Sequence, residues 1–198
     1  ASEYQELPVA VSVPRSEADV RQLLEFARRH GLGIIPRGAG TSLAGQVVGS
    51  GLVVDVGRHL NRILAIDATR RRVRVQPGVV RNELNLALKP HGLLFGPETS
   101  TANRAMIGGM VGNNSCGSNS VVYGSTRDHL VSARGLLSAQ GGVLRDKLFQ
   151  RHRCARNRTP VWLKRVNVDR LPRCEVFFVA KHTANVSLRC AHRWDQRL

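Results

Sequence analysis

A glycine-rich stretch at residues 36–46 contains residue types well suited to hold a charged ligand. It reads Pro-Arg-Gly-Ala-Gly-Thr-Ser-Leu-Ala-Gly-Gln. Glycines let a backbone approach an anion closely, and consecutive N–H groups can surround phosphate oxygens. The hydroxyls of Thr41 and Ser42 are further donors, and Arg37 can add positive charge or simply pair with an acidic neighbour. The stretch therefore predicts a binding site for a phosphate-bearing ligand.

Two common phosphate-binding motifs do not fit this stretch. A nucleoside-triphosphate P-loop ends in Gly-Lys-Ser/Thr, whereas Gly45 is followed by Gln46 and no lysine is near. A Rossmann fingerprint needs a glycine where Leu43 stands, and it opens a helix, which Gly49 and Gly51 disfavour here. A loop that wraps a dinucleotide without a helix N-terminus remains as the favoured interpretation.

Further short motifs follow in a fixed order. Residues 76–78 read Gln-Pro-Gly, residues 96–101 read Gly-Pro-Glu-Thr-Ser-Thr, and residues 107–110 read Ile-Gly-Gly-Met. Asn-Asn-Ser stands at 113–115, and Tyr-Gly at 123–124. Each motif alone is weak, and its glycines could serve tight turns only. Their order and spacing together are specific.

Over about residues 8–142, this series resembles the FAD-binding domain of the vanillyl-alcohol-oxidase type, also called the PCMH-type domain. It is most similar to the branch that holds D-lactate dehydrogenases, the glycolate oxidase flavin subunit and long oxidoreductases fused to an iron–sulfur module. The resemblance implies an α+β fold of two α/β subdomains, within a domain at 1–142. The first would span about 8–75, and the second would begin at about 76 and be incomplete.

The resemblance also implies which residues contact FAD. Residues 37–46 would cradle the pyrophosphate and ribityl chain, and Pro97, Ser100 and Thr101 would approach the middle of the flavin. A second stretch rich in glycine and asparagine, residues 106–124, would line the isoalloxazine and phosphates. The implied cofactor-binding residues are Pro36, Arg37, Gly38, Ala39, Gly40, Thr41, Ser42, Gly45, Gln46, Pro97, Ser100, Thr101, Gly108, Gly109, Asn113, Asn114 and Ser115.

Covalent attachment of FAD is not expected. Members of the family that attach FAD use a His or a Cys, and no His lies within 37–51 or 101–117. Cys116 is best explained as a small packed residue. No His-x-His pair is present, so no metal site is expected.

The resemblance implies oxidation of a small 2-hydroxy acid such as D-lactate, glycolate or D-2-hydroxyglutarate. In that family a second domain supplies substrate contacts and the catalytic base. No catalytic residue is identified in this chain, which we expect to be the cofactor half of an enzyme, with an iron–sulfur subunit or domain as a further partner. A fragment without activity is an alternative.

The composition changes after Gly142. Residues 1–141 hold 16 Lys and Arg against 10 Asp and Glu, whereas residues 142–198 hold 14 against 4, and no glycine follows Gly142. Residues 143–198 are therefore interpreted as a basic tail of unknown structure, either a native extension or the product of a shifted reading frame. The pI of about 11.4 raises nucleic-acid binding as a rival function. The concentration of charge in the tail makes that rival function the less favoured one.

The elements that must position these motifs can be read from periodicity and turn residues. Ser16 and Gly31 are expected to bound a helix, and 82–88 a second, shorter one. Strands are expected at 9–13, 34–35, 52–56, 63–67, 72–76 and 130–139. No run of 18 apolar residues occurs, and the first residues are polar, so we expect a cytoplasmic protein or one held at a membrane through partners.

Overall fold

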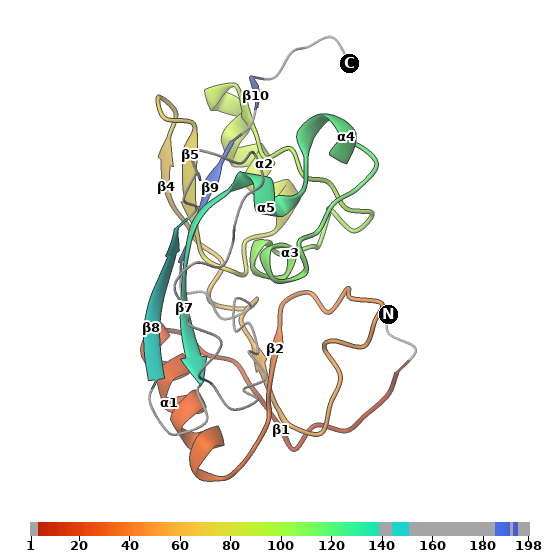
Figure 1. Ribbon diagram of the computed structural model, residues 1–198, viewed down its shortest axis with the longest axis vertical. Helices are drawn as coiled ribbons and strands as arrows, with labels where there is room; N and C mark the ends of the chain where they lie inside the picture. Colours follow the sequence, from red (N-terminus) through yellow and green to blue (C-terminus); the bar gives the residue numbers. More distant parts are fainter. Residues whose placement is uncertain (1–3, 139–143, 151–184, 191, 194–198) are drawn as a thin grey trace, which may run out of the picture.

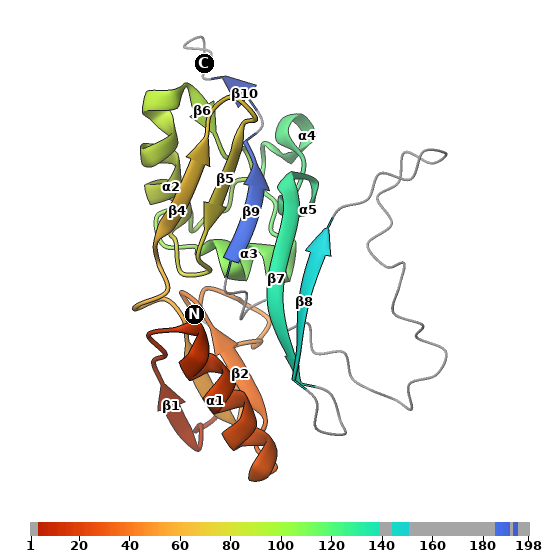
Figure 2. The same cartoon turned by 90° about the vertical axis from the view of Figure 1, so that its left-hand side faces the viewer.

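The computed structural model describes residues 4–138, 144–150, 185–190 and 192–193. These residues form a three-stranded sheet and a five-stranded sheet, one above the other along the long axis of the molecule, and a short two-stranded sheet (Figure 1). The strands of the lower sheet lie near the N-terminus of the chain, and helices cover one face of the upper sheet (Figure 2). The expected mixture of helices and strands is confirmed.

The lower sheet is parallel and carries one helix. Its strands are β1 (Ala10–Ser12), β2 (Ile34–Arg37) and β3 (Leu52–Asp55), in the order β1-β3-β2. Helix α1 (Glu17–Arg29) starts at the predicted cap, because Ser16 Oγ accepts a hydrogen bond from Asp19 N–H and the Asp19 carboxylate accepts one from Ser16 N–H. It packs Val20, Leu24 and Ala27 against β3.

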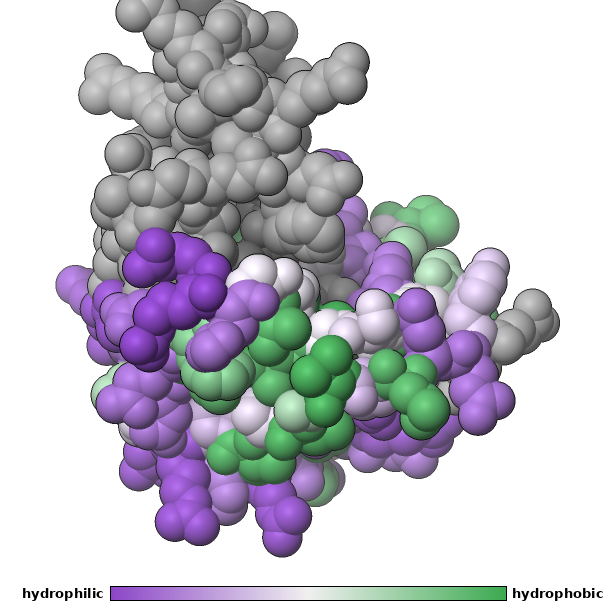
Figure 3. Space-filling model, turned by 90° about the horizontal axis from the view of Figure 1, so that it is seen from below, coloured by the Kyte–Doolittle hydropathy of each residue, from purple (hydrophilic) through white to green (hydrophobic). Residues whose placement is uncertain are grey.

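Apolar side chains also gather on the outside of this lower unit. Val9 and Val11 are 63% and 62% exposed, and Phe26 of α1 is 43% exposed. Figure 3, which views the molecule from below, shows hydrophobic residues clustered on that face. A parallel sheet is usually covered on both faces, whereas only α1 packs here as a helix within the described residues.

The upper sheet is antiparallel and has five strands in the order β4-β5-β9-β7-β8. Its strands are β4 (Ile63–Asp67), β5 (Arg72–Val75), β7 (Leu130–Ser138), β8 (Leu144–Gln150) and β9 (Asn185–Arg189). The elements between β5 and β7 are α2 (Arg81–Leu88), the 3₁₀ helix η1 (Lys89–His91), β6 (Leu93–Leu94), α3 (Ile107–Asn113), α4 (Ser120–Tyr123) and α5 (Thr126–His129). β10 (His192–Arg193), the last strand, pairs antiparallel with β6. Helices α2 and α3 cover one face and bury Leu84, Ile107 and Met110 against it.

The border between the lower and upper sheets lies earlier in the chain than the border predicted between the two subdomains. Strands β4 and β5 belong to the upper sheet, so the two sheets divide before Ile63 rather than near residue 75. The turn at 77–78 marks the end of β5, and it does not mark a border between sheets. Sheet membership depends on partners far along the chain, which local turn residues do not reveal.

Part of the basic tail is also built into the sheet. β8 pairs with β7, and β9 lies between β5 and β7 with Val186 and Leu188 fully buried. The tail, whose structure the sequence left open, therefore contributes residues 144–150 and 185–190 to the sheet. Residues 151–184, 191 and 194–198 lie outside the described residues.

Within the described residues, no helix is both long enough and apolar enough to cross a membrane.

Candidate functional site

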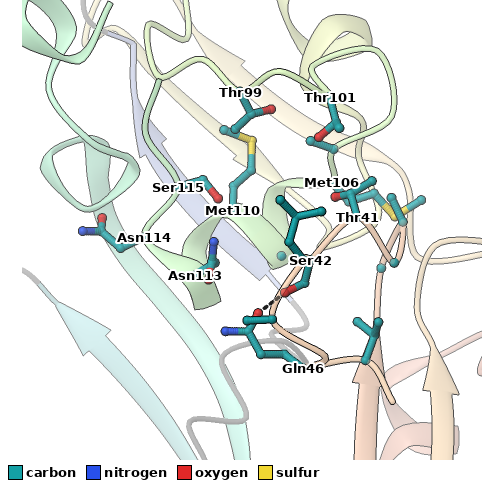
Figure 4. A pocket seen from close by; sticks show the side chains of 18 of the residues that line it. Thr41, Ser42, Gln46, Thr99, Thr101, Met106, Met110, Asn113, Asn114 and Ser115 are labelled. Carbon is teal, nitrogen blue, oxygen red and sulfur yellow. Dashed lines mark hydrogen bonds between the residues drawn. The ribbon is translucent and has the colours of Figure 1, made fainter. Parts of the chain in front are cut away.

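A pocket of about 540 Å³ lies where the lower and upper units meet. One wall comes from the end of β2 and the loop after it, residues 36–47, and the other from residues 99–116 of the upper unit. Figure 4 shows Thr41, Ser42 and Gln46 on one side and Met110, Asn113 and Ser115 on the other. The two glycine-rich stretches singled out in the sequence thus face the same cavity.

The first wall is an irregular loop that leaves the end of a parallel strand. Such a strand end is a common location for ligand sites, because the loops there can open around a ligand. Gly40 and Gly45 have φ values of +67° and +71°, which L residues with side chains rarely adopt. A hydrogen bond from Ser42 Oγ to Gln46 Oε1 closes the loop on itself. The loop thereby presents backbone and hydroxyl groups to the pocket.

The second wall begins at helix α3, which the sequence had suggested only as a glycine- and asparagine-rich stretch. Two adjacent glycines of this helix face different surroundings. A Cβ on Gly108 would lie 2.6 Å from Pro77 Cβ, so that glycine serves packing inside the protein. A Cβ on Gly109 would meet no atom within 4 Å, and Gly109 lines the pocket.

Residues 99–105 complete the second wall, and helix α2 holds the segment 97–105 that contains them. Arg81 Nε donates to the Pro97 carbonyl at 3.2 Å, and Arg81 N–H donates to the Ala105 carbonyl at 2.9 Å. Burial lowers the pKa of Arg81, and the neighbouring Glu98 charge opposes that shift. Thr99 Oγ1 is buried at the pocket wall and has no hydrogen-bond partner.

The structure brings most of the predicted cofactor-binding residues to the pocket wall. They are Pro36, Gly38, Ala39, Gly40, Thr41, Ser42, Gln46, Ser100, Thr101, Gly109, Asn113, Asn114 and Ser115. Arg37, Gly45, Pro97 and Gly108 do not line it. Arg37 and Gly45 lie against other residues of the chain instead. The Arg37 guanidinium is 2.9 Å from where a Cβ on Gly40 would lie, and a Cβ on Gly45 would lie 2.7 Å from the Tyr4 ring.

Several lining residues were missed by sequence reasoning. They are Leu43, Ala44, Val47, Val56, Thr99, Ala105, Met106, Met110 and Cys116. Thr99 lies inside a motif that had been recognised, so its hydroxyl could have been included. Met106 and Met110 carry no sequence signal beyond ordinary core spacing. Among the described residues, no His, Cys, Asp and Glu cluster could hold a metal ion.

Comparison with known proteins identifies the class to which this fold and pocket belong. A family model described as "FAD binding domain" matches residues 8–147. The chain belongs to that family, so FAD is the cofactor of the domain and the resemblance seen in the sequence is confirmed.

The relatives are much longer than this chain. D-2-hydroxyglutarate dehydrogenase of Pantoea ananatis (strain AJ13355) is 47% identical over 137 residues, which are 68% of this chain and 13% of that protein. Glycolate oxidase subunit GlcD of Bacillus subtilis (strain 168) is 35% identical over 144 residues, 72% of this chain and 30% of that one. A solved alkyldihydroxyacetonephosphate synthase shares the fold, with a TM-score of 0.67 at 19% identity, over 92% of this chain and 31% of that one.

The residues of the pocket fit FAD. The open side of Gly109 leaves a surface on which a flat ring can lie, and a side chain would fill that space. The unpartnered Thr99 Oγ1 needs a polar partner, because a buried hydroxyl without one is unfavourable. The first wall offers backbone N–H groups and the Thr41 hydroxyl, which suit phosphate oxygens, and the Ser42 hydroxyl could donate to one on leaving Gln46 Oε1.

Proposed function

We propose that this chain is the cofactor-binding portion of a flavin-dependent oxidoreductase that oxidises a 2-hydroxy acid. The substrate would be of the D-2-hydroxyglutarate, glycolate or D-lactate type, which are the types in the names of the relatives. The observation that carries the proposal is the pocket between the two units, where Gly109 presents an open face opposite the glycine-rich loop.

When bound, FAD supplies a hydride acceptor for the carbon that bears the hydroxyl of the acid. The chain would hold the diphosphate with backbone groups between Gly38 and Ser42 and would orient the cofactor with the hydroxyls of Thr99 and Thr101. Met106 and Met110 add an apolar surface that excludes water from part of the pocket.

The described lining of the pocket holds none of the side chains that most often remove a substrate proton. Among its described lining residues there is no His, Asp, Glu, Lys, Arg or Tyr. General-base help typically contributes about 10²–10⁴ in rate. We therefore propose that the base and the substrate contacts come from a further domain of a longer protein, since this chain spans only 13% of the first relative. Electron transfer to an iron–sulfur subunit or domain is part of the same proposal.

We propose that FAD is held non-covalently. No histidine lines the described pocket, and Cys116 is its one thiol. Cys116 is exposed, so its interpretation as a small packed residue was wrong. The location of the protein stays a prediction, namely the cytoplasm or a membrane surface reached through partners.

Reconstitution of the full 198-residue chain with FAD tests the proposal. The purified chain is mixed with FAD, separated from free cofactor by gel filtration, and examined by its visible absorption spectrum. We expect co-elution of FAD, and competition by ADP, which carries the diphosphate. A chain that is folded by circular dichroism and leaves the column without flavin would refute the proposed function.

A matched pair of variants locates the site. Gly109→Leu should abolish retention of FAD, because the leucine would occupy the open face of the pocket. Gly33→Leu is the control, since a Cβ on Gly33 also meets no atom within 4 Å and Gly33 does not line the pocket. Equal retention by both variants would place the flavin elsewhere.

A further inference from the structure

The segment 123–129 follows the pocket wall in sequence and does not itself line the pocket. It contains the Tyr-Gly motif, which has no role in the proposed cofactor contacts. We propose that this segment is a clasp that positions the pocket wall at residues 114–116, with Thr126 as its central positioning residue. This inference rests on the proposed binding of FAD, because the clasp acts on the shape of the cofactor pocket.

Thr126 makes two hydrogen bonds to one backbone carbonyl of the pocket wall. Thr126 Oγ1 donates to the Ser115 carbonyl at 2.6 Å, and Thr126 N–H donates to the same carbonyl at 3.0 Å. Thr126 is fully buried, so water cannot substitute for either bond. Ser115 lines the pocket, and its carbonyl orientation therefore depends on a residue outside the pocket.

Asn114, the wall residue before Ser115, is held by α5, the short helix that begins at Thr126. Arg127 N–H donates to Asn114 Oδ1 at 2.9 Å. In Figure 4 the Asn114 side chain points away from the other labelled residues of the pocket. Asn114 has φ +48° and ends α3, a left-handed conformation that asparagine tolerates better than most residues. The bond to Arg127 stabilises this turn, and the turn directs the chain from α3 along the pocket.

The clasp is itself rigidly built. Ser125 N–H and Oγ both donate to Asp128 Oδ2 at 2.9 Å, which closes a capping box on α5. Gly124 has φ +75°, and a Cβ there would lie 2.9 Å from the same carboxylate oxygen. His129 is buried, its Nε2 lies 2.6 Å from the Tyr123 carbonyl oxygen, and its ring meets the Phe95 ring edge-on at 5.6 Å. The histidine is thus an anchor of the segment.

A contact on the other side of the wall limits where the chain can go after residue 116. A Cβ on Gly117 would lie 2.4 Å from the Glu98 carbonyl oxygen, so the chain passes close against residues 97–99. The backbone at Gly117 is also fixed by a hydrogen bond, because Gly117 N–H donates to Ser120 Oγ at 2.8 Å. Residues 114–117 are therefore held by contacts on two sides, from α5 and from the segment that contains Thr99. Loosening the clasp should move the wall as a unit.

Conservative variants of Thr126 test the clasp in the full chain. Thr126→Val keeps the β-branched shape and removes the hydroxyl donor, whereas Thr126→Ser keeps the donor. Thr69→Val, on the exposed β4–β5 turn, is the control for the same chemical change. Three quantities are measured: the Kd for FAD, the visible circular dichroism of bound FAD, and amide hydrogen exchange of residues 111–117 without FAD.

We expect Thr126→Val to raise the Kd for FAD about tenfold, as follows from losing one buried hydrogen bond that shapes the site. The visible circular dichroism should change, and exchange at 111–117 should become faster, while Thr126→Ser restores all three. A lower melting temperature with unchanged flavin circular dichroism and unchanged Kd would overturn the clasp. A wild-type chain that binds no FAD would instead refute the proposed function. Hydrogen exchange is measured without FAD, so an unchanged exchange rate at 111–117 in Thr126→Val would overturn the clasp whether or not FAD binds.

Discussion

Substitution of Gly109 by alanine should have opposite effects on the empty protein and on cofactor binding. Gly109 lies in helix α3, and an added Cβ meets no atom within 4 Å. Glycine within a helix is less favourable than alanine by about 0.5–1 kcal/mol, because it loses more backbone entropy on folding. The melting temperature of the empty chain should therefore rise by about 1–4 °C in Gly109→Ala.

The same methyl group should weaken FAD binding, since it enters the space that the cofactor would occupy. Inserting a methyl into a well-packed contact costs about 1–3 kcal/mol, which is about 5- to 150-fold in Kd. Melting is followed by circular dichroism without FAD, and the Kd by quenching of flavin fluorescence. Together the two measurements separate an effect on the fold from an effect on the site.

The neighbouring glycine provides the control. Gly108→Ala would place its Cβ 2.6 Å from Pro77 Cβ and 3.0 Å from the Pro77 carbonyl oxygen, so it should lower the melting temperature. A Gly109→Ala chain that binds FAD as tightly as the wild type would refute the assignment of that face to the cofactor. A Gly109→Ala chain that melts lower than the wild type would show that its Cβ is not in open space.

The remaining predictions concern attachment, the tail strand, pH and turnover. Acid precipitation of the reconstituted chain should leave FAD in the supernatant, and flavin in the pellet that Cys116→Ser abolishes would contradict non-covalent binding. Val186→Asp should lower the free energy of unfolding by about 4 kcal/mol in denaturant titration, because an unpaired charge would be buried, and a loss near zero would show that β9 is not in the core. Burial raises the pKa of Cys190 from 9.0 to about 11, so its contribution to stability should be complete below pH 9 and decrease as the pH rises to about 11; a wild type and Cys190→Ala that lose stability in parallel over this range would contradict it. D-lactate, glycolate and D-2-hydroxyglutarate should not bleach bound FAD at catalytic rates under anaerobic stopped flow, and rapid bleaching would reveal a base within the chain.

Local signals in the sequence were sufficient for much of the lower unit. Helix α1 is determined by signals that lie within the helix and its cap. They are the capping pair Ser16 and Asp19 and the apolar spacing of Val20, Leu24 and Ala27. Strand β3 was likewise predicted from a continuous apolar run, which is typical of a buried parallel strand. In each case the residues that form the element also carry the signal for it.

The site was predictable where backbone chemistry alone determines it, and less so where orientation matters. The stretch 36–46 could be identified from its glycines and hydroxyls. Gly108 and Gly109 are indistinguishable in sequence, although one packs on Pro77 and the other faces the pocket. Asn114 was expected to contact the cofactor and lines the pocket, but the sequence did not reveal that its side-chain oxygen accepts a hydrogen bond from Arg127 N–H. Side-chain direction depends on the path of α3, and that path is set by tertiary packing.

The tail shows why composition can mislead about which residues support a site. A strand of five residues is too short to alter the average character of a basic, glycine-free segment, yet β9 occupies the middle of the upper sheet. Val75 pairs with Val186, and Ala133 pairs with the same residue from the other side. Without β9, β5 and β7 would lose their shared partner, and the core that includes Ile107 and Met110 of α3 would lose Val186 and Leu188. Since α3 carries Gly109 and leads into the turn at Asn114, the shape of the cofactor pocket depends on residues of the tail that do not line it.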